Sequence, residues 1–212
     1  MIEEVLRYLR RIERFRNRNR LKNRSFSLVT NNCIGGIISH DMHLRFLSPT
    51  VNLSFTNEGF ILFCQHLVHY LSIPVQEVES DKGYPVGVLK GEYGDVLLYF
   101  MHYNSFLEAK QKWEERALRV EMENLFIIME AQKCEESILH VFDELDYSNK
   151  VILTDGFHSD IRCSFPVKDG FYDKGYFNGK ILSYPKFGLR RYLDRFDYVS
   201  FFNKGVIRRR YV

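Results

Sequence analysis

Residues 125–154 read LFIIMEAQKCEESILHVFDELDYSNKVILT, and this stretch decides the class of the fold. It contains two apolar runs, 125–129 and 150–154, of the kind found in strands that are buried on both faces. The residues between the runs, 134–145, have the pattern of an amphipathic helix. Two parallel strands need such a crossover between them, so the order strand, helix, strand predicts a βαβ unit.

The chain before this unit supplies the other expected members of the fold. Helices are predicted over 35–44, over 57–71 with Thr56 as its cap, and over 105–120. Residues 86–90 and 95–100, joined by Gly91-Glu-Tyr-Gly94, predict a β-hairpin. We therefore predict a three-layer α/β/α fold with a mostly parallel central sheet, in which the hairpin supplies an antiparallel member and the strands are 26–31, 95–100, 125–129 and 150–154.

Composition limits the class of protein. The 212 residues suit one domain with an arm, and 45% hydrophobic with 27% charged residues is a globular mixture, which excludes a disordered chain. No apolar run approaches the ~18 residues of a membrane-spanning helix, and the first residues lack the pattern of a secretory signal. Four cysteines stand apart at 33, 64, 134 and 163, which favours a reducing, cytoplasmic location.

Charge is distributed unevenly along the chain. Residues 1–24 carry a net charge of +6 and residues 165–212 carry +7, whereas residues 25–164 carry −10. Two interpretations remain open: the basic ends pack on the acidic body and neutralise it, or one of them faces an anionic partner.

The segment 1–24 is predicted to be a basic amphipathic helix followed by a linker that begins after Asn17. The helix should carry one apolar stripe, formed by Ile2, Val5, Leu9 and Ile12. The stripe could dock on the domain, or residues 1–20 could make a peripheral contact with the inner face of the membrane. We expect the stripe to be buried; exposure would favour the membrane.

The segment 166–212 is predicted to be an aromatic, basic cap on the α/β domain, which spans 25–165. The last 48 residues hold thirteen Phe and Tyr residues, and five glycines among them break any long element. Such rings either pack on the sheet without ligand or stack on sugars and bases between the basic side chains.

A binding site is predicted at the turn that follows the first strand. In open α/β sheets ligands bind at the carboxyl ends of strands. The turn offers Asn31, Asn32, Gly35 and Gly36, which could hold the anionic part of a substrate at the start of the next helix. Cys33 lies in the same turn and is a candidate nucleophile, although simple packing is the open alternative.

Two further loops should converge on the same edge of the sheet. His102 is the strongest candidate acid/base group, with Tyr103 beside it as a substrate contact, and Asp155 could orient a base or a hydroxyl. No third ligand accompanies the histidine pairs 40/43 and 66/69, and no D-x-D pair occurs, so neither a metal nor another cofactor is predicted.

Several blocks of sequence resemble one bacterial family. They are Ser27-Leu-Val-Thr-Asn-Asn-Cys-Ile-Gly-Gly36, Ser48-Pro49, Pro85-Val-Gly87, Leu98-Tyr-Phe-Met-His-Tyr103 with Ala109, Lys112, Trp113 and Arg116, and Asn124-Leu-Phe-Ile-Ile-Met129. Together they are similar to the domain-of-unknown-function family nineteen-nineteen over about 25–165. Many of its members are labelled exopolysaccharide biosynthesis proteins. The resemblance therefore implies a role in building surface polysaccharide and supplies no established reaction.

Two functions follow as expectations. The first is a metal-independent glycosyl- or acyl-type transferase of exopolysaccharide or lipopolysaccharide biosynthesis, which takes a nucleotide-activated or other anionic small-molecule donor. The second is a non-catalytic binding or scaffold module of the same pathway. Nucleic acid is not an expected partner, because the body is acidic and no motif of a known nucleic-acid-binding domain appears.

Overall fold

The two apolar runs form neighbouring strands at the centre of a four-stranded sheet. The computed structural model describes residues 2–131, 134–171 and 179–207. The sheet contains β1 (Ser27–Thr30), β5 (Leu125–Glu130), β6 (Lys150–Thr154) and β7 (Ser164–Pro166), all parallel, in the order β1-β5-β6-β7. The predicted α/β fold and its central parallel pair are confirmed.

The side chains of this sheet are shared between two cores, one on each face. Ile127 and Ile152 enter the core on one face, whereas Phe126 and Val151 enter the core on the other. All six residues of β5 are buried, as expected of a central strand without a solvent-facing side.

The predicted hairpin forms, but it belongs to a separate sheet. β2 (Gln76–Val78), β3 (Val86–Gly91) and β4 (Gly94–Tyr99) make a three-stranded antiparallel sheet. Placing 95–100 in the central sheet was therefore wrong. Residues 47–55 run along the outer edge of β1, where the Ser27 hydroxyl donates to the Leu47 carbonyl and the Thr30 amide donates to Thr50 Oγ1. That edge is already occupied, and the hairpin touches the covering segment through one Ser54–Tyr99 bridge.

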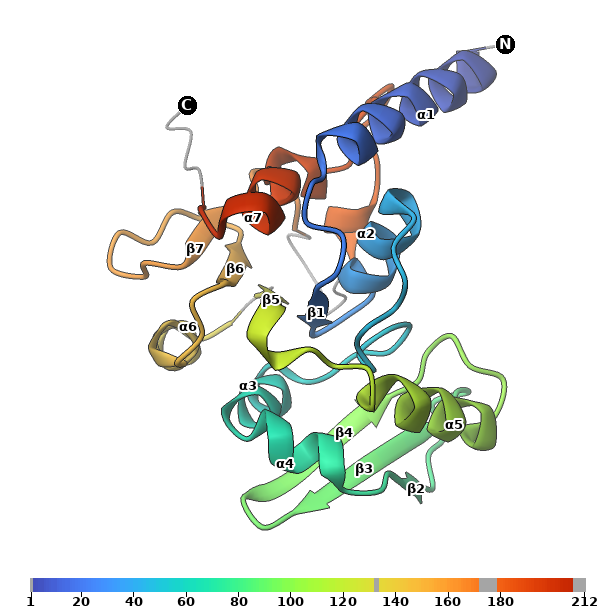
Figure 1. The fold of residues 1–212 in the computed structure, drawn as a ribbon, viewed down its shortest axis with the longest axis vertical. Coiled ribbons are helices and arrows are strands. Elements are labelled where there is room, and N and C mark those ends of the chain that lie inside the picture. The colour runs from blue at the N-terminus through green and yellow to red at the C-terminus, as the bar shows by residue number, and fades with distance from the viewer. Residues whose placement is uncertain (1, 132–133, 172–178, 208–212) are drawn as a thin grey trace.

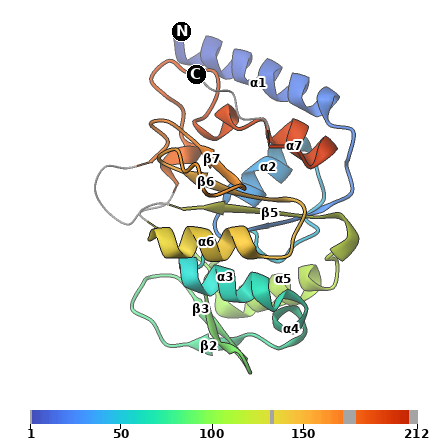
Figure 2. The same cartoon turned by 90° about the vertical axis from the view of Figure 1, so that its left-hand side faces the viewer.

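Helices cover both faces of the larger sheet (Figures 1 and 2). The helices are α1 (Ile2–Arg20), α2 (Ile34–Met42), α3 (Asn57–Gln65), α4 (Leu67–Ser72), α5 (Phe106–Ala117), α6 (Glu136–Glu144) and α7 (Tyr198–Lys204). Short 3₁₀ turns occupy Met122–Asn124, Lys180–Leu182 and Leu193–Arg195. In Figure 2, α2 and α7 lie on one side of the sheet, and α3 and α6 lie between it and the small sheet. The single helix predicted over 57–71 is two helices, because the backbone leaves helical geometry at His66.

The aromatic C-terminal segment packs on the sheet where the structure describes it. Phe196, Phe201 and Phe202 are almost fully buried, and the Phe201 ring meets Phe126 of β5 edge-on at 5.2 Å. These rings therefore belong to the core and are not a stacking surface. Of the predicted segment 166–212, residues 172–178 and 208–212 lie outside the described residues.

The N-terminal helix is longer than predicted and is turned differently. It continues to Arg20, so the linker expected after Asn17 was wrong. Ile2 and Val5 are 66% and 54% exposed, and Leu6 is the buried residue of the helix. The prediction that the whole apolar stripe is buried was therefore also wrong. In the described chain no helix is both long and apolar enough to cross a membrane.

Candidate functional site

The turn after β1 uses most of its own hydrogen-bonding groups. The Ile34 amide donates to Asn32 Oδ1 at 3.0 Å, and the Gly35 amide donates to Thr30 Oγ1 at 3.2 Å. The Thr30 hydroxyl in turn donates to the Asn32 carbonyl at 2.7 Å. Two of the amides that the N-terminus of α2 would offer to an anion are thus occupied by side chains.

The two glycines of this turn lie in close packing contact with their neighbours, and the contact is tighter at Gly35. A Cβ atom on Gly35 would lie 2.9 Å from Thr30 Oγ1, and one on Gly36 would lie 3.3 Å from Asn52 Oδ1. Both residues are buried. Close approach between α2 and its neighbours is therefore a sufficient reason for the Gly-Gly pair, with no ligand involved.

The two asparagines converge on a buried carboxyl group, Glu130, at the carboxyl end of β5. Asn31 Nδ2 donates to the Glu130 carbonyl at 2.9 Å, and the Glu130 amide donates back to Asn31 Oδ1 at 3.0 Å. Asn32 Nδ2 donates to Glu130 Oε2, and the Gly179 amide donates to Oε1 at 3.1 Å. Glu130 has no exposed surface. The ends of β1 and β5 and the segment at Gly179 are therefore joined through one side chain.

This environment changes the acidity of Glu130. Burial raises its pKa from the ordinary 4.5 to about 7, although the Gly179 amide and Asn32 favour the charged form. The two groups that bond to the carboxylate among the described residues, Asn32 and the Gly179 amide, are both uncharged. A carboxyl group that titrates near neutral pH at the strand ends is the property expected of an acid/base residue.

Cys33 lies beside this carboxyl group and is half-buried. Burial raises the pKa of its thiol, and the negative charge of Glu130 raises it further. A nucleophilic cysteine needs the thiolate, which both effects disfavour. The structure places Cys33 between β1 and α2, at the carboxyl end of that strand, and its role as a nucleophile stays a prediction.

Tyr103 and Arg116 reach the same region from the small sheet and α5. The Tyr103 hydroxyl donates to the Val51 carbonyl at 3.0 Å and accepts from Arg116 Nη1 at 2.8 Å. Burial raises the pKa of Tyr103, and Cys33 contributes to its electrostatic surroundings. The Arg116 guanidinium stands 5.3 Å from the centre of the Phe46 ring and is partly exposed. Arg116 is therefore a positively charged side chain whose position is fixed by the Tyr103 hydroxyl.

The other two predicted catalytic residues lie apart from this group. His102 and Asp155 are both exposed, in the loops after β4 and β6 respectively. In the described part of the chain no hydrogen bond or ion pair connects either side chain to Cys33 or Glu130. Their catalytic roles stay predictions.

An open groove of about 890 Å³ lies beside the small sheet. It is lined at one end by Tyr103 and by Asn104 and Phe106 at the start of α5. Strand β2 and the loop that leads to β3 contribute the other wall, with Glu77 on the strand and Glu79 and Tyr84 in the loop. Since Tyr103 also contacts Arg116, the groove and the strand-end group share a residue.

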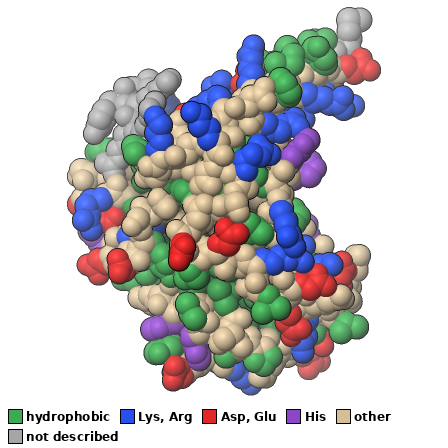
Figure 3. Space-filling view, viewed as in Figure 1, with side chains coloured by type: hydrophobic (Ala, Val, Ile, Leu, Met, Phe, Trp, Pro, Cys, Tyr) green, Lys and Arg blue, Asp and Glu red, His purple; other side chains and the backbone are tan. Residues whose placement is uncertain are grey.

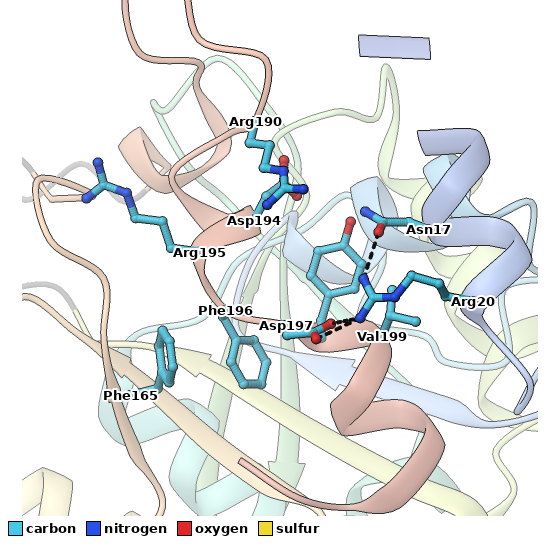
Figure 4. A pocket seen from close by; sticks show the side chains of 10 residues that line it. Asn17, Arg20, Phe165, Arg190, Asp194, Arg195, Phe196, Asp197 and Val199 are labelled. Atoms are coloured by element: carbon cyan, nitrogen blue, oxygen red, sulfur yellow. Dashed lines mark hydrogen bonds and ion pairs between the residues drawn. The ribbon is translucent and has the colours of Figure 1, made fainter. Parts of the chain in front are cut away.

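A second cavity, of about 300 Å³, lies where α1 meets the C-terminal segment (Figure 4). Arg20 donates to Asn17 and to both oxygens of Asp197, at 2.9 and 2.7 Å. Arg190 is paired with Glu13 at 3.0 Å. These cations are neutralised within the protein, so the cavity is better explained by packing between the two ends than by an anion site.

One group of side chains has the spacing of metal ligands. Glu136 and His140 stand one turn apart on α6, and with Asp160 their ligand atoms lie within 4.8 Å of one another. All three are exposed, and His140 Nε2 is 3.1 Å from Asp160 Oδ2. The His140–Asp160 ion pair by itself accounts for this contact.

Sequence reasoning missed Glu130 and Arg116 as site residues. Glu130 immediately follows the buried run 125–129. A carboxylate at the carboxyl end of a central strand is a candidate site residue, so the sequence could have identified it. Arg116 lies one turn beyond Lys112 and Trp113 on a predicted helix. Its relation to Tyr103 depends on tertiary structure.

The fold and the site together define an α/β protein with a strand-end polar centre to which a small antiparallel sheet contributes. The chain belongs to the family described as Domain of unknown function (DUF1919), whose model matches residues 4–203. The match is wider than the 25–165 expected and includes most of α1 and all of α7 except its last residue. A relative from Haemophilus influenzae strain Rd, described as an uncharacterized protein, is 35% identical over 185 residues, which is 87% of each chain.

Proposed function

We propose that the protein is a transferase of surface-polysaccharide biosynthesis, which moves a sugar or acyl group from an activated anionic donor to a hydroxyl group of an acceptor. The feature that favours a reaction over binding alone is the buried Glu130 at the ends of β1 and β5. Burial raises its pKa to about 7, and because its side chain is fully enclosed we assign it to position the turn through Asn32 and not to touch the substrate. The polysaccharide context comes from the family resemblance, since many members carry that label.

Arg116 is the group that we assign to the anionic part of the donor. The amides of the turn after β1 are engaged internally, whereas the Arg116 guanidinium is partly exposed and is held by Tyr103. Guanidinium groups bind phosphate through paired hydrogen bonds. The donor would thus lie beside Cys33, within reach of the turn and its asparagines.

The groove that begins at Tyr103 is the place that we assign to the acceptor. Its carboxylates, Glu77 and Glu79, can accept hydrogen bonds from hydroxyl groups, and its rings offer apolar faces. His102 precedes Tyr103 and is exposed, so it could take the proton from an acceptor hydroxyl. The four cysteines are unpaired, which fits a reaction in the reducing cytoplasm.

The donor assignment can be tested by thermal shift. The purified protein is heated with nucleotide sugars, coenzyme A esters and free nucleotides. A ligand at one hundred times its Kd should raise Tm by about 5–10 °C in a chain of this size. Arg116→Ala should lose this shift. Arg119→Ala should retain it, because Arg119 follows α5 and pairs with Glu115 of that helix. Equal shifts in the two variants, or no shift with any of these ligands, would contradict the assignment.

Turnover distinguishes the transferase from a binding module. The identified donor is incubated with short oligosaccharides, and transfer is followed by mass spectrometry. Both Glu130→Gln and His102→Ala should abolish transfer, and His102→Ala should keep the wild-type Tm because its side chain is exposed. Binding of donor and oligosaccharide without transfer by the wild type would favour the non-catalytic module. The open form of the groove is the feature that suits that second function.

A further inference from the structure

The N-terminal helix α1 contacts the rest of the protein through its polar side. Arg10 donates to the Gly188 carbonyl at 2.9 and 3.1 Å, and Glu13 is paired with Arg190. Arg14 approaches Asp41 of α2 at 3.8 Å. Leu6 adds a buried apolar contact on the same side. Most of the contacts that hold α1 on the body are therefore hydrogen bonds and ion pairs. An amphipathic helix usually packs through its apolar side instead.

The apolar side of α1 is left open to solvent. Val5, Tyr8 and Phe15 are 54%, 65% and 58% exposed. With the half-buried Ile12 they follow steps of three, four and three residues, which places them along one helical face. Ile2 extends the exposed apolar surface at 66%. We call Ile2, Val5, Tyr8, Ile12 and Phe15 the outer stripe. Figure 1 shows α1 projecting beyond the body, and Figure 3 shows hydrophobic side chains on that projection.

Beyond the first turn, which carries Glu3 and Glu4, positive charge lies along one side of the outer stripe. Arg7 and Arg11 lie on the same turns as the stripe, are exposed, and make no ion pair among the described residues. Residues 184–197 lie against α1 and carry four basic and two acidic side chains, a net charge of +2. Figure 3 shows Lys and Arg side chains gathered at this end of the molecule. Part of the second basic segment thus lies beside α1.

An exposed apolar stripe beside basic side chains favours one class of binding partner for α1. Two copies of this end would bring like charges together, which disfavours a second copy of the chain. An anionic lipid surface supplies both an apolar layer for the stripe and negative headgroups for the arginines. We propose that α1 binds the surface of an anionic membrane, with the outer stripe in the boundary between headgroups and acyl chains.

Vesicle sedimentation tests this proposal on the full chain without any substrate. The protein is mixed with phosphatidylcholine vesicles, with and without phosphatidylglycerol, at low and high salt. We expect binding to the anionic vesicles alone, and it should weaken as salt rises because surface charges are screened. Val5→Ser with Tyr8→Ser should abolish it. Arg7→Gln with Arg11→Gln should weaken it roughly 30-fold, at about a factor of five for each arginine.

Leu118→Ser is the matched control, because Leu118 is 91% exposed and lies after α5, away from α1. It should bind like the wild type. All replaced residues are exposed, so unchanged Tm values show that the variants fold. The proposal is overturned by absent binding, by equal binding to neutral vesicles, or by binding that survives Val5→Ser with Tyr8→Ser. A dimer in sedimentation velocity that this double variant dissociates would also overturn it, since the stripe would then join two copies.

Discussion

Replacing Glu130 by glutamine should change how the stability of the protein depends on pH. Glutamine keeps the size of the side chain and one oxygen acceptor for the Gly179 amide, but it cannot ionise. In the folded protein the pKa of Glu130 is raised to about 7, against an ordinary 4.5 in the unfolded chain. The folded state therefore holds this proton more tightly. The resulting stabilisation is complete below pH 4.5 and is lost as the pH rises through 7.

The size of this effect follows from the two pKa values. A tenfold difference in proton affinity corresponds to about 1.4 kcal/mol, so the rise from 4.5 to about 7 corresponds to a loss of about 3 kcal/mol. In a chain of this length such a loss lowers Tm by about 6–12 °C. Because Glu130→Gln lacks the titration, its stability should fall less over the same range of pH.

Urea unfolding of the two proteins between about pH 5 and pH 8 measures the effect. The relevant quantity is the difference in unfolding free energy between wild type and variant at each pH, because the other titrating groups cancel in it. Glu144→Gln, at an exposed glutamate at the end of α6, is the control and should follow the wild type. A difference that stays constant over this range would refute the assignment of a protonated, buried Glu130.

Three further predictions concern single side chains. In Glu130→Gln the thiol of Cys33 should react faster with iodoacetamide at about pH 8, because the charge that raises its pKa is gone; peptide mapping that finds an unchanged rate would count against their proximity. Asp197→Ala removes the N-cap of α7 and should cost about 1–2 kcal/mol in urea unfolding. The pKa of Asp197 is lowered, so this stabilisation should be present at neutral pH and fade in acid below its ordinary 3.8, and a pH-independent cost would contradict the ionised cap. Gly87→Ala would place a Cβ atom 2.6 Å from Val75 Cγ2 and should cost about 1–3 kcal/mol, whereas a wild-type Tm would show that the small sheet gives way freely.

The central part of the fold could be predicted because its signal is local. The runs 125–129 and 150–154 are apolar at every position except their ends Lys150 and Thr154, and burial on both faces follows from that composition alone. Which of the two sheets the hairpin joins could not be predicted in this way. It depends on whether the edge of β1 is free, and the segment 47–55 that covers the edge has no periodic pattern.

The candidate site was predictable in its location and not in its contacts. Asn31 and Asn32 predict a polar centre at a strand end. Their partner Glu130, however, comes from a strand 98 positions further along the chain, and Gly179 comes from a third segment. Sequence spacing cannot show which of several polar loops meet. For the same reason the pattern of α1 revealed an apolar stripe without showing that the polar side would face the body.

The pairing of β1 with β5 constrains the order in which the chain folds during synthesis. Ser27 pairs with Leu125, 98 positions later, and the small sheet with its hairpin lies entirely between them. At bacterial and eukaryotic elongation rates this separation delays the closing of the larger sheet by about 5–20 s. The hairpin is complete well before that time, whereas β1 waits with its apolar side chains unpaired. A nascent chain of this protein therefore holds Leu28 and Val29 of β1 without their β5 neighbours for several seconds.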